Sequence, residues 1–563
     1  MTTPASPDDV LRAKARAWQA VDPDPATVAE VQAVLDAGDV TALGERFEHR
    51  LQFGTAGLRG ALGAGPNRMN RVLVRVATAG VATWLAKQGL DGPVVIGRDA
   101  RHGSADFAHD AAQVFAAAGF PVRMLPEPVP TPVTAFAVRH LGAIAGVMVT
   151  ASHNPPQDNG YKLYLGDGAQ IVSPTEVEIS ACIDDVDWGS VPPMRADGIE
   201  PAGDEVIEAY LEGALDLLEP GPRQIATVYT AMHGVGAATA RRAFAAAGFP
   251  APVEVTAQVE PDPDFPTVAF PNPEEPGALD LALATARASG AELVIANDPD
   301  ADRLAVAVPE AGREGGWRAL TGDELGTLLA DHLLRRAPRT ADDLVATTVV
   351  SSRLLQRLAA DAGAGYGEAL TGFKWVVRTP AAGQRFLFGY EEALGYCVGE
   401  LVRDKDGITA ALAVAELAAA LRADGRTLLD RLAEIFRAHG AHVTRQRSIR
   451  VAGTDWLTRV TAAMDAVRSA PPTELAGRPV TAVEDLERTP SRFPVASDVL
   501  VWTLDGARAV VRPSGTEPKL KCYAEAVEPV GADGDVAAAR ARALETVDAV
   551  LDAVGTLLAA HGL

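Results

Sequence analysis

The stretch Ala143-Ile-Ala-Gly-Val-Met-Val149, followed by Thr150-Ala-Ser-His-Asn-Pro-Pro-Gln-Asp158, is the most informative part of this chain. Its first half is a short apolar run, which is typical of a buried strand. Its second half interrupts that strand with a hydroxyl, an imidazole and two prolines. Asn159-Gly160 predicts a turn, after which Tyr161-Lys-Leu-Tyr-Leu165 resumes an extended pattern.

This strand-loop-strand pattern presents one candidate nucleophile. Ser152 lies on the loop beside His153, ten residues before Lys162. A serine held on a stiff turn among cationic groups is suited to phosphoryl chemistry, because cations stabilise a developing alkoxide. Three further polar loops, each after an apolar strand, supply the other groups that such chemistry needs.

The surrounding sequence alternates short apolar strands with helices rich in alanine and leucine. Val94-Val-Ile-Gly97, the helical pattern of residues 104–118 and Val122-Arg-Met-Leu125 follow one another in this way. Such alternation predicts α/β layers around parallel or mixed sheets. Phe115-Ala-Ala-Ala-Gly-Phe-Pro121 recurs as Phe244-Ala-Ala-Ala-Gly-Phe-Pro250, which favours an ancestral duplication and an ordinary glycine-capped helix end equally.

The length of 563 residues predicts several domains rather than one core. Stretches rich in glycine, proline or charge suggest boundaries near 205, 320 and 440. We therefore expect a helical extension up to about Ala42, and the domains 1–205, 206–320, 321–440 and 441–563. The last is expected to be a smaller α+β domain ending in a helix.

Composition excludes several classes of function. The net charge of −23 argues against nucleic-acid binding, which requires a basic face. The apolar run from Ile408 to Leu421 contains Glu416 and is too short to span a membrane. Three scattered cysteines form neither a metal motif nor a disulfide framework, so we expect a cytoplasmic protein.

The second loop, Asn297-Asp-Pro-Asp-Ala-Asp-Arg303, places three carboxylates at alternate positions after an apolar strand. Oxygen ligands at this spacing suit a hard divalent cation such as Mg²⁺. A calcium-binding EF-hand is excluded, because its sixth and twelfth positions are occupied here by Arg303 and Pro309. A solvated acidic turn remains an alternative, although three neighbouring charges repel one another without a cation.

The third and fourth loops are less specific when taken alone. Gly389-Tyr-Glu-Glu-Ala-Leu-Gly-Tyr396 offers two adjacent glutamates that could accept hydrogen bonds from sugar hydroxyls. Val511-Arg-Pro-Ser-Gly-Thr-Glu-Pro518 combines a guanidinium, two hydroxyls and an accessible backbone, which together favour anion binding. A surface glutamate pair and a polar hairpin turn are the ordinary alternatives.

Taken together and in this order, the four loops resemble those of the α-D-phosphohexomutase superfamily, the phosphoglucomutases and phosphomannomutases. Gly54-Thr-Ala-Gly-Leu-Arg-Gly60 is similar to a further active-site segment of that family, and the resemblance extends from about residue 50 to 525. It implies three related mixed-sheet α/β domains and a smaller C-terminal α+β domain around a central cleft.

The resemblance also implies the reaction. Ser152 would carry a phosphoryl group beside Mg²⁺, pass it to a sugar phosphate, and regain the other phosphate from a sugar 1,6-bisphosphate intermediate. The metal ligands would be Asp298, Asp300, Asp302 and the Ser152 phosphate. The other catalytic groups would be His153, Lys162, Arg59 and Lys405, with Lys405 as the candidate base. Substrate would contact Thr371, Gly372, Lys374, Glu391, Glu392, Arg303, Arg512, Ser514, Gly515 and Thr516.

One departure from the family pattern leaves the sugar open. Many members have serine and some have histidine where this chain has Ala393 and Gly395. This form resembles the phosphoglucomutase/phosphopentomutase branch, which has broader substrates. Glucose or mannose phosphates are still the expected substrates, with phosphopentomutase or sugar-bisphosphate synthase activity as the alternative. A Mg²⁺-dependent sugar phosphatase and an inactive sugar-phosphate sensor are more remote alternatives. We expect a monomer or homodimer that acts on small sugar phosphates and binds neither nucleic acid nor membrane.

Overall fold

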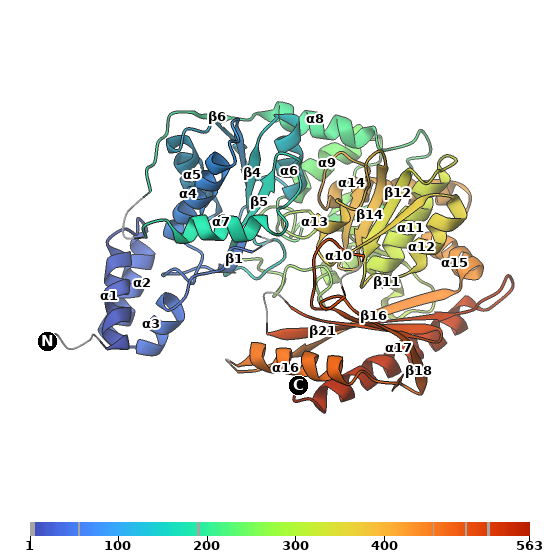
Figure 1. Ribbon diagram of the computed structural model, residues 1–563. Coiled ribbons are helices and arrows are strands. Elements are labelled where there is room, and N and C mark those ends of the chain that lie inside the picture. Colours follow the sequence, from blue (N-terminus) through green and yellow to red (C-terminus); the bar gives the residue numbers. More distant parts are fainter. Residues whose placement is uncertain (1–5, 55–56, 189–191, 454, 490–491, 515–517) are drawn as a thin grey trace. The chain divides into compact units, whose positions relative to one another are not determined.

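The computed structural model describes residues 6–54, 57–188, 192–453, 455–489, 492–514 and 518–563 (Figure 1). The chain forms two compact units. One consists of residues 1–320 with 393–420, and the other consists of residues 321–392 with 421–563.

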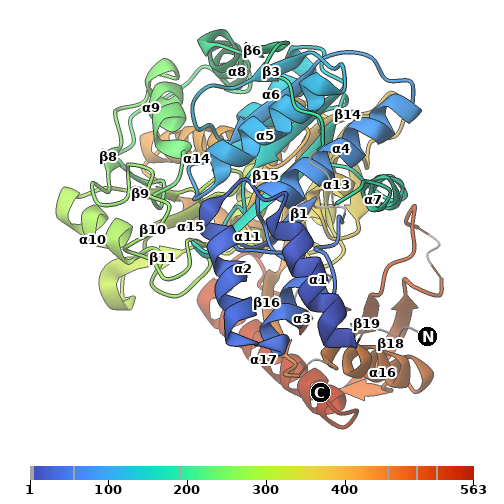
Figure 2. The same cartoon turned by 90° about the vertical axis from the view of Figure 1, so that its left-hand side faces the viewer.

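Three short helices precede the first sheet. Helices α1 (Pro7–Gln19), α2 (Pro25–Ala37) and α3 (Val40–Phe47) lie side by side in both views (Figures 1 and 2). Each begins at a side-chain N-cap, namely Ser6, Asp24 and Asp39 respectively. The rings of Trp18 and Phe47 meet edge to face at 6.0 Å. The predicted helical extension therefore continues about five residues beyond Ala42.

The first sheet is mixed and has the strand order β1-β5-β4-β2-β3-β6. Strands β2, β3, β4 and β6 run parallel, whereas β5 is antiparallel to both β4 and β1. The bounds are β1 (Leu58–Ala61), β2 (Val94–Arg98), β3 (Val122–Met124), β4 (Ala145–Val149), β5 (Asp158–Leu165) and β6 (Ile199–Pro201).

Helices cover both faces of this sheet because β2 and β4 are apolar on both sides. Val94 and Val147 belong to the core shared with α4 (Arg71–Lys87), α5 (Ser104–Ala117) and α7 (Thr175–Asp184). On the other face, α6 (Thr131–His140) packs directly on β2 and β4, and α8 (Asp204–Leu215) packs beside α6. Gly146 permits this approach, since a Cβ there would lie 2.3 Å from the side chain of Val138.

The turn predicted at Asn159-Gly160 is wrong. Both residues lie inside β5, where Gly160 is paired with Arg59 of β1. A Cβ on Gly160 would lie 2.5 Å from the Thr150 carbonyl oxygen and 2.8 Å from that of Leu58. Glycine is therefore required here by the close approach of two backbones rather than by a turn.

The second sheet has the order β11-β10-β9-β7-β8 and is also mixed. Its strands are β7 (Thr227–Thr230), β8 (Val253–Glu254), β9 (Leu293–Ala296), β10 (Ala305–Pro309) and β11 (Trp317–Ala319), with a 3₁₀ turn at Glu314–Gly316. Helices α9 (Gly236–Ala246) and α10 (Asp280–Ser289) belong to this layer. Strand β15 (Gly395–Val398) and most of α14 (Gly407–Ala423) come later in the chain and belong to the same compact unit, but β15 is not a strand of this sheet.

The repeated heptapeptides have the same local structure. Gly119 and Gly248 follow the ends of α5 and α9 with φ of 97° and 78°. The phenylalanine rings within each repeat pack against each other, at 6.3 Å in the first and 5.5 Å in the second. The predicted glycine-capped helix ends are therefore present, because a left-handed residue at this position favours glycine.

In the other unit, strand β12 (Asp343–Thr348) lies between β13 (Gly365–Ala369) and β14 (Arg385–Glu391) and runs parallel to both. The helices of this layer are α11 (Gly322–Arg335), α12 (Leu354–Ala362), α13 (Phe373–Val376) and α15 (Leu428–His439). Part of the predicted glutamate loop is thus strand, since β14 continues through Gly389 to Glu391.

The C-terminal sheet is antiparallel throughout, with the order β16-β21-β20-β19-β18-β17. Its strands are β16 (Ala441–Arg450), β17 (Glu474–Leu475), β18 (Arg478–Asp485), β19 (Leu500–Leu504), β20 (Ala507–Pro513) and β21 (Lys519–Glu528). Apolar residues of α16 (Trp456–Ser469) and α17 (Val536–Ala559) share a buried core with Trp502. The basic segment 439–450, next to the boundary predicted near 440, is largely strand β16.

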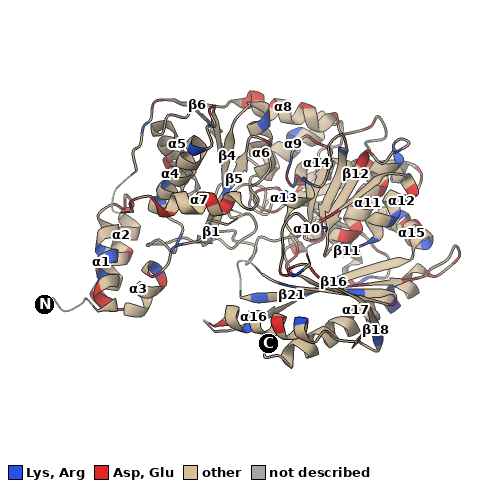
Figure 3. Cartoon of the chain, viewed as in Figure 1, with Lys and Arg blue, Asp and Glu red and all other residues tan. Residues whose placement is uncertain are grey.

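These elements confirm the predicted fold class of three α/β domains and a smaller C-terminal domain. The three boundaries proposed from sequence stay predictions. Acidic and basic residues are interspersed along exposed helices such as α1 and α3 (Figure 3). Among the described residues, no helix is both long enough and apolar enough to cross a membrane.

Candidate active site

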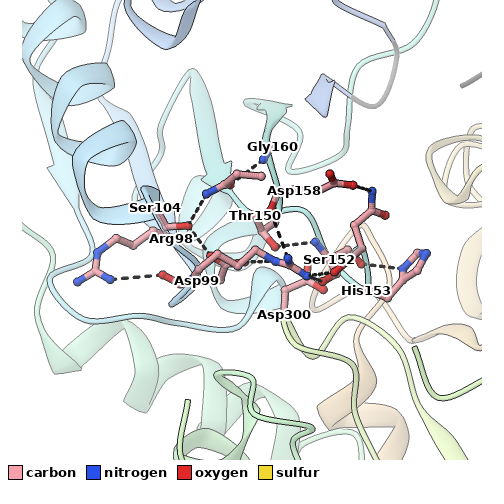
Figure 4. A network of polar contacts seen from close by, with 12 residues as sticks. Arg98, Asp99, Ser104, Thr150, Ser152, His153, Asp158, Gly160 and Asp300 are labelled. Carbon is pink, nitrogen blue, oxygen red and sulfur yellow. Dashed lines mark hydrogen bonds and ion pairs between the residues drawn. The ribbon is translucent and has the colours of Figure 1, made fainter. Parts of the chain in front are cut away.

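The loop after β4 holds Ser152 in an unusual backbone conformation. Ser152 has φ of 53°, which lies in the left-handed region and costs about 1–2 kcal/mol for a residue other than glycine. Its amide donates to the hydroxyl of Thr150 at 2.8 Å, and its own hydroxyl lies 3.2 Å from Nδ1 of His153 (Figure 4). The loop thus turns the serine side chain away from the strand direction.

The loop after β9 gathers three buried carboxylates. Asp298, Asp300 and Asp302 are at most 1% exposed, and each contributes one oxygen to a group whose atoms lie within 4.8 Å of one another. The side-chain amide group of Asn297 closes this loop, because it donates to the Arg303 carbonyl at 2.6 Å and accepts from the Tyr229 hydroxyl at 2.8 Å. The predicted convergence of the alternating aspartates is therefore present.

These two loops meet directly. The Ser152 hydroxyl donates to Oδ2 of Asp298 at 2.9 Å, and Oδ1 of Asp298 accepts from the backbone amide of Arg303 at 3.0 Å. Burial, together with the neighbouring Asp300 and Asp302, raises the pKa of Asp298 well above its ordinary range. The candidate nucleophile therefore lies against the acidic cluster.

The acidic cluster fits a hard divalent cation. One oxygen of Asp300 and one oxygen of Asp302 are buried and receive no hydrogen bond from any described residue. Buried carboxylate oxygens are costly when unpaired, and such oxygens are the ligands that Mg²⁺ prefers. Asp298, Asp300 and Asp302 are thus able to hold a divalent cation, and the identity of that ion stays a prediction.

Two lysines bring positive charge to the same carboxylates. Nζ of Lys162 lies 2.6 Å from Asp300 and 2.9 Å from Asp302. Nζ of Lys405 lies 3.4 Å from Asp302 and 3.4 Å from Asp404. Burial alone would raise the pKa of Asp302, but Lys162, Lys405 and Arg303 hold it below its usual range. The sequence predicts that Lys162 flanks Ser152, whereas the ion pairs of this lysine are with the aspartates.

His153 is a half-buried imidazole whose surroundings favour its neutral form. Burial lowers its pKa well below the ordinary value, and the nearby guanidinium groups of Arg303 and Arg59 lower it further. Arg59 lies on β1, and Nη1 of Arg303 donates to the Ala393 carbonyl at 3.0 Å. A neutral imidazole beside a serine hydroxyl is able to accept a proton from it.

Several polar side chains that sequence reasoning did not identify support this cluster. Asp404 accepts from the Tyr164 hydroxyl at 2.9 Å and from the Gln170 amide at 2.6 Å. The Thr131 hydroxyl donates to Asp300 at 2.5 Å. Tyr164 could have been found, because it follows Lys162 by two residues on a strand and so shares its face. No sequence pattern marks Thr131 as a partner of Asp300, since their contact depends on the tertiary fold.

The glutamates predicted to recognise sugar lie in the other unit. Oε1 of Glu391 accepts from the Gly372 amide at 2.8 Å, and the Glu392 amide donates to the Ser351 hydroxyl at 3.2 Å. The hydroxyl of Thr371 is buried and has no hydrogen-bond partner among the described residues. Glu391 and the segment of Thr371, Gly372 and Lys374 are therefore close neighbours.

The predicted phosphate loop is partly described. Arg512 lies on β20 opposite Lys521, and the Ser514 amide donates to the Lys519 carbonyl at 2.9 Å. Arg512 is also one of the charges that surround the buried hydroxyl of Tyr523, whose pKa is raised mainly by burial. Gly515 and Thr516 lie outside the described residues.

The structure brings the predicted residues together in two groups. Residues 1–320 with 393–420 contain the serine, the three aspartates and the cations around them. Residues 321–392 with 421–563 contain the segments predicted to bind sugar and phosphate. The roles of all these residues stay predictions.

Comparison with known proteins identifies the family. Four domain models of phosphoglucomutase/phosphomannomutase match in order: α/β/α domains I, II and III at residues 50–189, 208–312 and 321–439, and the C-terminal domain at 473–543. A "probable phosphomannomutase" of Haemophilus influenzae is 45% identical over 464 residues, covering 81% of this chain and 93% of the relative.

Other relatives have different names within the same group. A phosphopentomutase of Homo sapiens is 35% identical over 560 residues, covering 91% of each chain, and a human glucose 1,6-bisphosphate synthase is 34% identical, covering 90% of this chain and 88% of the relative. The crystal structure of a "putative phosphomannomutase" from Thermus thermophilus superimposes with a TM-score of 0.70 at 25% identity, covering 91% of this chain and 99% of that one. This chain is accordingly an intramolecular phosphotransferase of the phosphoglucomutase/phosphomannomutase family, within the α-D-phosphohexomutase superfamily.

Proposed function

We propose that the enzyme interconverts the 1-phosphate and 6-phosphate of a hexose, glucose or mannose, through a phosphorylated Ser152 and a sugar 1,6-bisphosphate. The observation that supports this most is the 2.9 Å hydrogen bond from the Ser152 hydroxyl to Asp298. It places a strained serine directly against one of three clustered, buried carboxylates, which is where a phosphoryl group would need a counter-cation. A bisphosphate intermediate would also serve as the activator that phosphorylates fresh enzyme.

We propose Mg²⁺ as that cation, held by Asp298, Asp300, Asp302 and the Ser152 phosphate. When bound, it neutralises phosphoryl charge and so makes the serine oxygen a better leaving group. Lys162, Arg303 and Arg59 add positive charge around the same position. Arg512, Ser514 and the segment 515–516 would bind the phosphate that does not react.

The transfer exchanges one phosphate ester for another. The free hydroxyl of the sugar phosphate attacks phosphorus, a new sugar–phosphate bond forms, and the bond from phosphorus to Ser152 Oγ breaks. The sugar hydroxyl loses a proton and Ser152 Oγ gains one, so charge is conserved. After the bisphosphate has reoriented in the site, Ser152 Oγ attacks the other phosphorus and the bond from that phosphorus to the sugar oxygen breaks. The Ser152 proton passes to Nδ1 of His153, which lies 3.2 Å from the hydroxyl, and the released sugar oxygen takes up a proton, so charge is again conserved.

Lys405 is better suited to remain a cation than to act as the predicted base. Its Nζ lies 3.4 Å from two buried carboxylates, Asp302 and Asp404, which favour the charged ammonium. Arg403, a neighbouring cation that could otherwise favour a neutral lysine, is paired with Asp167 at 3.5 Å. We therefore assign to Lys405 the stabilisation of charge on the reacting hydroxyl and its phosphate.

Pentose phosphates are the second candidate substrates. The chain lacks a serine at Ala393, and relatives that cover nine-tenths of it include a human phosphopentomutase. The ratios of kcat/KM for glucose, mannose, glucosamine and ribose 1-phosphates separate the candidates. A ribose preference would replace the hexose assignment and leave the mutase reaction intact.

The phosphoserine step can be tested by intact mass. Wild-type protein should gain one phosphoryl group when incubated with glucose 1,6-bisphosphate, and Ser152→Ala should gain none and lose mutase activity. Ser289→Ala, on an exposed helix of the same unit, is the matched control and should behave as wild type. Full activity in Ser152→Ala would refute the proposed mechanism.

Three free, buried cysteines are compatible with a reducing compartment, and a cytoplasmic monomer or homodimer stays our prediction.

A further inference from the structure

A buried arginine lies behind the serine loop. Arg101, which is 4% exposed, donates to four carbonyl oxygens of that loop. Its Nη2 lies 2.6 Å from the carbonyl of Ser152 and 2.5 Å from that of Asn154. Its Nη1 lies 2.8 Å from the carbonyl of Pro155 and 3.2 Å from that of Asp158. The whole span from 152 to 158 is therefore bound by one side chain.

The orientation of this arginine is itself fixed. Oδ1 of Asp99 accepts from the Ser104 hydroxyl at 2.6 Å (Figure 4). The same oxygen accepts from the Arg101 amide at 3.0 Å, and Oδ2 of Asp99 lies 3.3 Å from Nε of Arg101. Ser104 in turn accepts from the side-chain amide of Asn159 at 3.0 Å. The Phe265 ring lies 4.8 Å from the guanidinium carbon.

The four carbonyl groups explain why residue 101 is an arginine. Carbonyl oxygens that point to one place repel one another unless a donor lies between them. A guanidinium presents two pairs of N–H groups in a rigid plane, whereas a lysine ammonium is a single point with three donors. Only an arginine at 101 can therefore bind both ends of the loop at once.

The geometry also connects Arg101 to the reacting group. The carbonyl that it binds at 2.6 Å belongs to Ser152 itself, the residue with φ of 53°. This left-handed conformation directs the hydroxyl toward Asp298 at 2.9 Å. If the carbonyl rotated away, the serine side chain would move with it.

We propose that Arg101 is a positioning residue for phosphoryl transfer: by binding the Ser152 carbonyl it holds the serine hydroxyl in line with the acidic cluster. The inference rests on the proposed role of Ser152 as the phosphoryl carrier. Arg101 contacts the loop through backbone carbonyls, so it acts on the reaction only through the position of Ser152.

The test compares two substitutions of Arg101 with one of another buried arginine. Arg101→Lys and Arg101→Met remove the planar set of donors, whereas Arg75→Met removes a buried guanidinium of the same domain that pairs with Asp110 at 2.9 Å. For each protein, thermal denaturation gives the folded fraction. Intact mass after mixing with glucose 1,6-bisphosphate gives the rate of Ser152 phosphorylation, and steady-state assays give kcat and KM.

Misplacing a reacting group by about 1 Å can slow a reaction about a hundredfold, so we expect phosphorylation and kcat to fall about tenfold to a hundredfold in both Arg101 variants. KM should change little, and Arg101→Lys should retain more activity than Arg101→Met. Arg75→Met should lose thermal stability but phosphorylate Ser152 at the wild-type rate per folded molecule. This pattern would separate positioning from a merely structural role.

Wild-type rates in folded Arg101 variants, or a loss that only follows the folded fraction as in Arg75→Met, would overturn the inference. If neither Arg101 variant folds, Ser104→Ala decides, because it keeps Arg101 but removes one of the two hydrogen bonds that hold Oδ1 of Asp99. Slowed phosphorylation in a stable protein supports the inference, and a wild-type rate overturns it. Absence of phosphorylation in the wild-type protein would instead refute the proposed function.

Discussion

The hydroxyl of Ser152 and Oδ2 of Asp298 are joined by a hydrogen bond of 2.9 Å across 146 residues of sequence. Each residue lies just after a buried strand, β4 in one case and β9 in the other. The bond makes the serine a donor to a carboxylate whose pKa is raised by burial and by like charge. Phosphoryl chemistry at Ser152 and cation binding at Asp298 are therefore expected to depend on one another.

Asp298→Asn should abolish stabilisation by Mg²⁺. A ligand that binds only the folded state adds about 2.7 kcal/mol to the free energy of unfolding at a hundred times its Kd. The wild-type Tm should therefore rise as MgCl₂ is added, whereas the Tm of Asp298→Asn should stay constant. Asp264→Asn, which removes an exposed carboxylate that pairs with His102, is the control and should respond as wild type.

The same substitution should change the pH dependence of the metal-free protein. Because the pKa of Asp298 is raised above 3.8, the folded state holds a proton that the unfolded chain releases at lower pH. This contribution to stability is present below the unfolded pKa and is lost as pH rises through the folded pKa. In urea unfolding without metal, the free energy of unfolding should therefore fall less steeply with rising pH in Asp298→Asn than in wild type. An equal dependence on pH in the two proteins would contradict the raised pKa.

Lys162→Met should destabilise the metal-free protein and be rescued by Mg²⁺. The ammonium lies 2.6 Å from Asp300 and 2.9 Å from Asp302, and removing one partner of a buried ion pair costs about 3–5 kcal/mol. An added divalent cation would restore part of the missing positive charge. Lys87→Met, which removes an exposed lysine of the same domain, should have little effect with or without Mg²⁺. Equal losses of stability in Lys162→Met and Lys87→Met would show that the Lys162 ion pairs make no specific contribution to the stability of the metal-free protein.

Much of the fold and of the acidic cluster follows from local pattern. Alternating carboxylates after an apolar strand, as at Asp298, Asp300 and Asp302, can only converge or repel, and the preceding strand fixes their direction. The helix ends at Gly119 and Gly248 follow from the need for a left-handed residue. Such features depend on neighbours within a few positions, which the sequence displays directly.

Other features depend on tertiary contacts and were missed or misjudged. Asn159-Gly160 has the composition of a turn, but Gly160 is required inside β5 because the backbone of Leu58 passes 2.8 Å from where its Cβ would be. Arg101 belongs to no motif, since its partners are backbone carbonyls that any sequence provides. Thr131 reaches Asp300 from 169 positions away, and no local pattern marks such a pair.

Glu525→Gln should weaken the unit that contains the C-terminal sheet, most of all at neutral pH. Glu525 is 2% exposed and accepts from Arg353 at 2.8 Å and from the Ser352 hydroxyl at 2.7 Å, while Arg508 lies 3.1 Å away. Burial alone would raise its pKa, but Arg508, His442 and Arg353 hold it below the ordinary 4.5. Removing the charge would leave the buried guanidinium of Arg508 without its ion pair, at a cost of about 3–5 kcal/mol.

The sign of the pH effect follows from that depressed pKa. The stabilisation by Glu525 is present above about pH 4.5 and is lost as pH falls toward the folded pKa, so the wild-type and variant unfolding curves should converge in acid. Glu528→Gln, on the same strand, breaks a more exposed pair with Arg542 at 3.4 Å and should cost less than about 1 kcal/mol. A constant difference between wild type and Glu525→Gln at all pH values would contradict this account.

Ala393→Ser should sharpen the preference for hexose phosphates. Ala393 follows the two glutamates of the sugar loop, and its carbonyl accepts from Arg303 at 3.0 Å, so the position is fixed by the backbone. A serine there would add one neutral donor, worth about 1 kcal/mol or about a fivefold change in kcat/KM. The ratio of kcat/KM for glucose 1-phosphate to that for ribose 1-phosphate should rise by about this factor, because the pentose offers one hydroxyl fewer. Ala381→Ser, on an exposed turn, should leave the ratio unchanged. If Ala393→Ser raises both constants equally, the added hydroxyl contacts a group that both sugars share, and residue 393 does not determine the choice of sugar.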